Sequence, residues 1–223
     1  MAVKWTEEEI GSFIVSDLEN ELGAIALSYI ATLERIDLML TEFWEKGEIT
    51  GKINRWEKKE VEGTASRYAI FIHEMSMLAL AKAVEDVQYD MNERLNMNFD
   101  IFKTKMDHPH LLHTRTCKSL SNVSKHNRSL LVEGSSRSAD YIIKEWGLNS
   151  GWDLGTYILA RHELFNILEY IPKMYLCLCA IIQELTDYKS PLYDDDWTKT
   201  SESLYRVILP QSFGIEVPKP EKQ

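Results

Sequence analysis

The sequence lacks an apolar run long enough to cross a lipid bilayer. Its most apolar stretch covers residues 174–182, whereas a membrane-spanning helix needs about 20 residues. The first residues, 1–13, also lack the basic region and the apolar run of a secretory leader. These two absences predict a cytoplasmic protein with no membrane span.

Cysteine is scarce as well, since the 223 residues contain only Cys117, Cys177 and Cys179. Three cysteines give no even disulfide framework, so we expect a reducing compartment. Cys177 and Cys179 lie within an apolar helical run, where free thiols behave as small hydrophobic side chains. A metal or redox role for this pair is the weaker alternative, because no second cluster of Cys or His at zinc-site spacing accompanies it.

Basic residues are outnumbered, and the common catalytic motifs are missing. With 25 Lys and Arg against 35 Asp and Glu, the net charge is −10, which repels polyanions and disfavours a protein that coats nucleic acid generally. The sequence has no glycine-rich phosphate loop, no G-x-S-x-G, no H-E-x-x-H and no C-x-x-C. Most common enzyme classes therefore have no support here, and no cofactor is predicted.

The chain does contain helical periodicity. Thr6 and the three glutamates after it form a capping box that starts a helix, and apolar residues then recur every three or four positions as far as Phe43. We expect this helix to end at Gly47, with room for a bend near Gly23. The same pattern predicts helices over residues 64–95, 115–125, 141–146 and 157–188, the last with a kink at Pro172.

No stretch of useful length alternates with period two, so no strand is predicted. The sequence therefore predicts an all-α protein, an up-and-down bundle of long helices in a single domain over residues 1–223, with its core in residues 6–188. Residues 97–113 and 127–138 are predicted to be connections. Residues 189–223 are predicted to form an irregular C-terminal segment, because they hold four prolines and a run of three aspartates.

One window departs from the acidic average. The 25 residues between Asp107 and Glu133 contain no acid, yet they hold Arg115, Lys118, Lys125 and Arg128 and four of the six histidines. A positive patch on an acidic body concentrates an anionic ligand at one place. The alternative is that Lys125 and His126 merely complement the exposed carbonyls of a helix C-terminus.

Three of those histidines, His108, His110 and His113, are close together in the sequence. They surround a proline and have no partnered carboxylate, so solvated loop histidines are a better interpretation than a metal site. No metal site is predicted.

Within the window, Asn122 and His126 have the relative spacing of the polar residue and the histidine in the HEPN signature. The stretch from Leu120 to Asn127 thus resembles the HEPN superfamily, small helical bundles common in prokaryotic toxin–antitoxin and antiviral defence systems. The arginine of that signature is absent, and Ser121 occupies its position. The resemblance implies RNA as ligand, a metal-independent endoribonuclease activity or a lost one, and a homodimer.

RNA cleavage needs a base for the ribose 2′-OH, an acid for the leaving oxygen and a cation for the charge that builds on the phosphorane. On this hypothesis His126, Asn122 and Lys125 are the candidate catalytic residues, with His126 as base and acid. Arg115, Lys118 and Arg128 are the candidate RNA contacts, and Lys125 or Arg128 would replace the absent arginine.

The competing hypothesis is a non-catalytic helical module that binds another protein, as antitoxins and immunity proteins do. The missing arginine favours it, and an acidic body suits a basic partner through complementary charge.

Overall fold

The computed structural model describes residues 5–46, 58–127 and 167–209. These residues form five helices, and no strand occurs among them. The helices are α1 (Glu7–Lys46), α2 (Lys58–Leu95), α3 (Leu111–Asn127), α6 (Ile167–Thr186) and α7 (Trp197–Ile208). The prediction of an all-α helical bundle is therefore confirmed.

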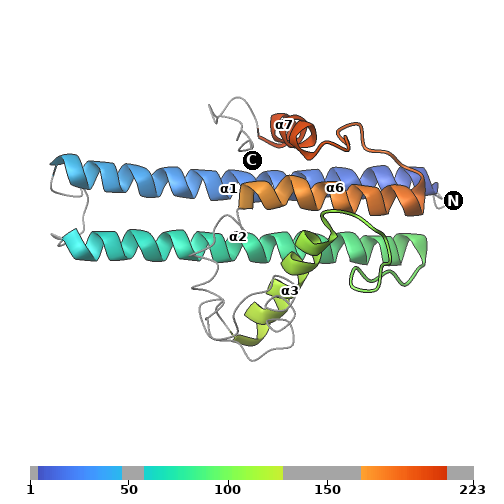
Figure 1. Ribbon diagram of the computed structural model, residues 1–223, viewed down its shortest axis with the longest axis horizontal. Coiled ribbons are helices and arrows are strands. Elements are labelled where there is room, and N and C mark those ends of the chain that lie inside the picture. The colour runs from blue at the N-terminus through green and yellow to red at the C-terminus, as the bar shows by residue number, and fades with distance from the viewer. Residues whose placement is uncertain (1–4, 47–57, 128–166, 210–223) are drawn as a thin grey trace.

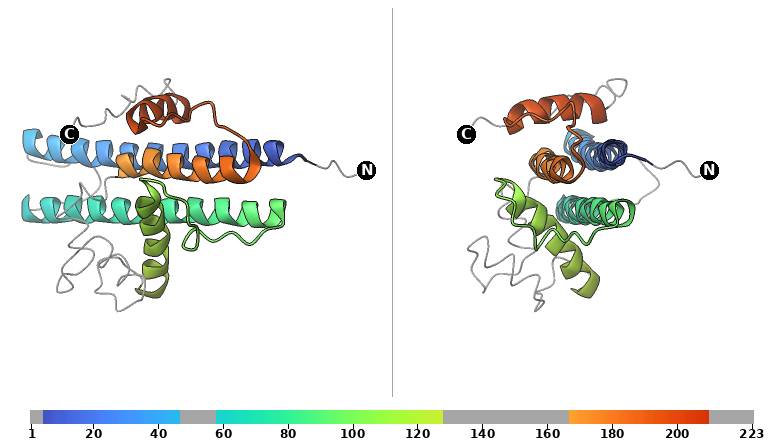
Figure 2. Two further views of the ribbon diagram at one scale, coloured as in Figure 1. Left: turned by 45° about the vertical axis from the view of Figure 1, so that its right-hand side comes forward. Right: turned by 90° about the vertical axis from the view of Figure 1, so that its right-hand side faces the viewer.

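The two longest helices, α1 and α2, lie side by side and antiparallel (Figure 1). α6 packs against both of them, while α7 lies against α1 and α6 (Figure 2). α3 packs on α2 and α6 and crosses them steeply. One hydrophobic cluster contains buried side chains from all five of these helices. None of the helices described combines the length and the apolarity that a membrane span requires.

The start of α1 follows the sequence prediction. The Thr6 backbone N–H donates to Glu9 Oε2 at 2.7 Å, and the Glu9 backbone N–H donates to Thr6 Oγ1 at 3.2 Å. This reciprocal pair is a capping box, and it satisfies two backbone donors that the first helical turn leaves open.

Two glycines of α1 mark close approaches of other elements. A Cβ at Gly11 would lie 2.3 Å from Thr186 Oγ1 and 2.6 Å from Tyr188 Cβ, whereas a Cβ at Gly23 would lie 2.9 Å from the Ile208 carbonyl oxygen. α1 remains helical through both positions. Gly23 therefore makes room for the end of α7. The sequence alone predicts a bend at Gly23 and not this packing role.

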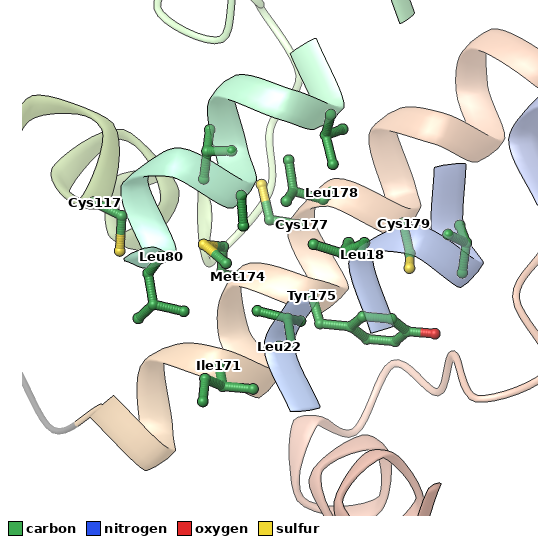
Figure 3. Packing of buried hydrophobic residues seen from close by; sticks show 14 of the residues in the cluster. Leu18, Leu22, Leu80, Cys117, Ile171, Met174, Tyr175, Cys177, Leu178 and Cys179 are labelled. Atoms are coloured by element: carbon green, nitrogen blue, oxygen red, sulfur yellow. The ribbon is translucent and has the colours of Figure 1, made fainter. Parts of the chain in front are cut away.

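The three cysteines belong to the core. Cys117, Cys177 and Cys179 are buried free thiols, and Figure 3 shows them among aliphatic side chains such as Leu80 and Leu178. Burial raises the pKa of all three thiols, that of Cys177 to about 11. The interpretation of Cys177 and Cys179 as small core side chains is confirmed.

The predicted irregular segment 189–223 was wrong for α7. Asp196 Oδ1 accepts hydrogen bonds from the Thr198 backbone N–H at 3.0 Å and from Thr198 Oγ1 at 2.7 Å, so the acidic run supplies an N-cap. Leu204 and Tyr205 are wholly buried, and the Tyr205 hydroxyl donates to the Leu168 carbonyl oxygen at 2.5 Å. Packing on α6 thus stabilises a helix that local composition disfavoured.

Further helix boundaries also differ from the prediction. α2 begins at Lys58 instead of residue 64, and α3 spans Leu111–Asn127 instead of residues 115–125. The connection after α2 therefore ends at residue 110 instead of residue 113. The backbone N–H of Leu111, the first residue of α3, donates to the His108 carbonyl oxygen at 3.0 Å. Asn127, predicted to begin a loop, is instead the last residue of α3. Residues 128–138 of that predicted loop, the predicted helix 141–146 and residues 157–166 of the last predicted helix lie outside the described residues.

Candidate functional site

The three candidate catalytic residues, Asn122, Lys125 and His126, lie in the last two turns of α3. Asn122 and His126 are four residues apart in a helix, so the two positions share one face. This end of α3 points away from α1 and α6 in both Figure 1 and Figure 2. The side chains of these three residues and the whole of Arg128 lie outside the part of the chain that the structure describes.

Arg115, a candidate RNA contact, is engaged within the protein. Its Nε donates to the Ile101 carbonyl oxygen at 2.9 Å, and its Nη2 donates to the carbonyl oxygens of Thr104 at 2.8 Å and Phe102 at 3.3 Å. A guanidinium presents several N–H donors in a fixed fork, which suits it to several carbonyls at once. Arg115 therefore anchors residues 101–104 to α3.

The same connection is also held by α2. Asn92 donates through Nδ2 to the Phe99 carbonyl at 3.0 Å and accepts the Phe99 backbone N–H at 2.5 Å, while Gln88 Oε1 accepts the Ile101 backbone N–H at 3.3 Å. Backbone groups that leave a helix need such partners when they are removed from water. Residues 99–104 are thus fixed between α2 and α3 by side chains of both helices.

Lys118, a second candidate RNA contact, forms an ion pair with Glu85 of α2. The Nζ and Oε1 atoms are 3.0 Å apart, and the two side chains are only 14% and 23% exposed. If Lys118 moved to a phosphate, it would leave a partly buried carboxylate without this cation, which costs more than breaking a surface pair. Lys118 therefore joins α3 to α2.

The histidines around Pro109 form a row that the sequence did not predict. The ring centroids of His108 and His110 are 5.6 Å apart, those of His110 and His113 are 5.7 Å apart, and both pairs are edge-to-face. The row continues to Tyr170 of α6, whose ring centroid is 5.1 Å from that of His113. The predicted solvated loop histidines are in fact only partly exposed and join the start of α3 to α6.

Burial and charge keep this histidine row neutral at pH 7. The pKa of His113 falls to about 3, first because the ring is removed from water and then because Lys173 and His110 lie near it. Burial, His108 and Lys173 lower the pKa of His110 to about 4. Burial also lowers the pKa of His108, and the charge of Asp195 opposes that shift. The row thus adds no positive charge to the basic window at pH 7.

Lys173 is itself held in place on α6. Its Nζ lies 2.9 Å from Glu169 Oε2 and 5.0 Å from the centroid of the Trp197 ring, so it makes an ion pair and a cation–π contact. No group of three or more His, Cys, Asp or Glu side chains suited to a metal ion occurs among the residues described.

The sequence carried no signal that Arg115 and Lys118 would bind groups within the protein. Glu85 is 33 residues away from Lys118 in the chain, and the carbonyls that Arg115 binds belong to every residue type. A count of charges along the window treats both cations as available, whereas only the packing of α3 on α2 reveals their partners.

Comparison with known proteins gives no relative: no family model, no curated protein and no solved structure matches this chain. The resemblance to the HEPN superfamily therefore stays a prediction, and function has to be argued from the residues and their geometry.

Proposed function

We propose that this chain acts by binding a basic protein partner and does not cleave RNA. The observation that carries this proposal is the engagement of Arg115 with three backbone carbonyls and of Lys118 with Glu85. An RNA-binding surface needs cations that can exchange water for phosphate. These two cations already have partners in the protein, and His110 and His113 in the same sequence window are neutral at pH 7.

The acidic charge of the chain supports the same proposal, because it is concentrated on one helix. α1 contains ten acidic and two basic residues, a net charge of −8, against −10 for the whole chain. Such a field accelerates encounter with a basic partner and disfavours a nucleic acid.

α1 also has an exposed side on which a partner could lie. Asp17, Ala24, Ala31 and Leu38 are exposed at seven-residue intervals, a spacing that keeps residues close to one side of a helix. The two alanines let another backbone approach closely, and Leu38, at 55% exposure, offers an apolar contact. A basic, helical surface is the partner that complements this line of acidic, small and apolar side chains.

Charge reversal on α1 tests the binding proposal. Tagged wild-type protein is used to capture partners from an extract of its own cells at low and moderate salt, beside Asp17→Lys/Glu34→Lys. Glu184→Lys/Glu202→Lys is the matched control, because both of its positions are exposed on α6 and α7 and the charge changes equally. We expect a basic protein that is lost with the α1 variant and retained with the control. Equal capture by both variants would contradict the proposal.

The RNase hypothesis is the second candidate, and the shared face of positions 122 and 126 on α3 favours it. The homodimer and the role in prokaryotic defence, which the HEPN resemblance implies, belong to this second hypothesis. Its test is cleavage of mixed cellular RNA in EDTA by wild type and His126→Ala, with detection of 2′,3′-cyclic phosphate ends. We expect no cleavage by folded wild-type protein, whereas cleavage that disappears in His126→Ala would overturn the proposed binding role.

A further inference from the structure

The connection between α2 and α3 is attached at its two ends by different chemistry. Residues 99–104 are held by the guanidinium of Arg115 and the carboxamide of Asn92, groups that do not titrate between pH 4 and 8. Residues 108–113 are held by the histidine row, which ends on Tyr170 of α6. Only the second attachment consists of groups that gain charge in mild acid once they are exposed to water.

Among the residues that the structure describes, the charged groups near the histidine row offer little compensation for that charge. Among the described residues, the charged groups that face the row are Lys173, with its partner Glu169, on α6, and Asp195 in the segment before α7. Asp195 acts on His108, at the far end of the row from Tyr170. Protonated rings at His110 and His113 would therefore stand beside one another and beside the Lys173 cation.

We infer that the histidine row is an acid-sensitive latch: protonation of its rings releases the start of α3 from α6, while residues 99–104 stay attached through Arg115. The row, Lys173 and the two chemically different attachments carry this inference. It does not depend on the proposed function, since it concerns the position of α3 and not what α3 binds.

The direction of the pH effect follows from the pKa values. In the unfolded chain a histidine has a pKa of 6.5, whereas in the fold that of His113 is about 3 and that of His110 about 4. The docked state therefore favours neutral rings, and its full stability is present above pH 6.5. That stability is lost progressively as the pH falls from 6.5 toward 4.

Hydrogen exchange of the whole protein at pH 7.5 and pH 5, corrected for intrinsic exchange rates, tests the latch. We expect the protection of peptides within residues 108–119 to fall roughly tenfold at pH 5, which corresponds to about one pKa unit of linkage from partly exposed rings. Peptides within residues 7–22 of α1 should keep their protection. Unchanged exchange at residues 108–119, or an equal loss in α1, would overturn the inference.

Two variants test which groups are responsible. His113→Phe keeps an aromatic ring against Tyr170 but cannot be protonated, so it should abolish most of the acid response. Lys173→Gln removes the cation that lowers the pKa of His110 and His113 in the fold. Those pKa values should then rise toward the unfolded value, which makes the acid response smaller. Lys199→Gln, at an exposed position on α7, should leave the response unchanged. If Lys173→Gln and Lys199→Gln both respond like the wild type, the latch is excluded even if His113→Phe fails to fold.

Discussion

Replacement of Arg115 by alanine should destabilise the protein, because the guanidinium is the donor for three carbonyls of the connection after α2. A hydrogen bond from a charged group contributes about 1.5–3 kcal/mol net. The hydrogen bond to Phe102 is exposed and long at 3.3 Å, so the bonds to Ile101 and Thr104 contribute most of the stabilisation. Water that reaches the freed carbonyls would replace part of the lost hydrogen-bond energy. We expect a loss of about 2–4 kcal/mol in the free energy of unfolding.

Urea denaturation followed by circular dichroism gives this free energy, with Arg115→Lys and Arg206→Ala as companions. A lysine keeps the charge but not the fork, so Arg115→Lys should recover less than half of the loss. The Arg206 side chain is exposed on α7, with its Nη2 4.0 Å from Glu202 Oε2, and its removal should cost under about 0.5 kcal/mol. If Arg115→Ala is as stable as Arg206→Ala, Arg115 is not an anchor, and its interpretation as an RNA contact becomes the better one.

Two further predictions concern the core. Gly11→Ala should lower the free energy of unfolding, measured by urea denaturation, by about 1–2 kcal/mol. The added methyl group would lie 2.3 Å from Thr186 Oγ1, and the cost of overpacking exceeds the helix propensity that alanine gains over glycine. A stabilised variant would show that α6 can move aside. A thiol reagent at pH 8 should modify Cys117, Cys177 and Cys179 only after denaturant is added, because burial both hides the thiols and raises their pKa, and rapid labelling of the folded protein would contradict their place in the core.

Local signals in the sequence were enough to identify the long helices. The capping box at Thr6 and the three-and-four spacing of apolar residues predict α1 to within a few residues, because both operate within one or two turns. The same reasoning failed for α7, where Asp196 was attributed to an irregular acidic run. Helices of that length form mainly through burial of one face, and the burial of Leu204 and Tyr205 depends on α6.

The candidate site divides in the same way. The sequence by itself determined which residue types gather between positions 108 and 132, and the helical period put Asn122 and His126 on one face of α3. Only the tertiary structure decided that Arg115 binds carbonyls of its own chain, that Lys118 pairs with Glu85, and that His110 and His113 are neutral at pH 7. The physical reason is that charge availability and pKa depend on burial and on partners that are distant in the sequence, which no local pattern encodes.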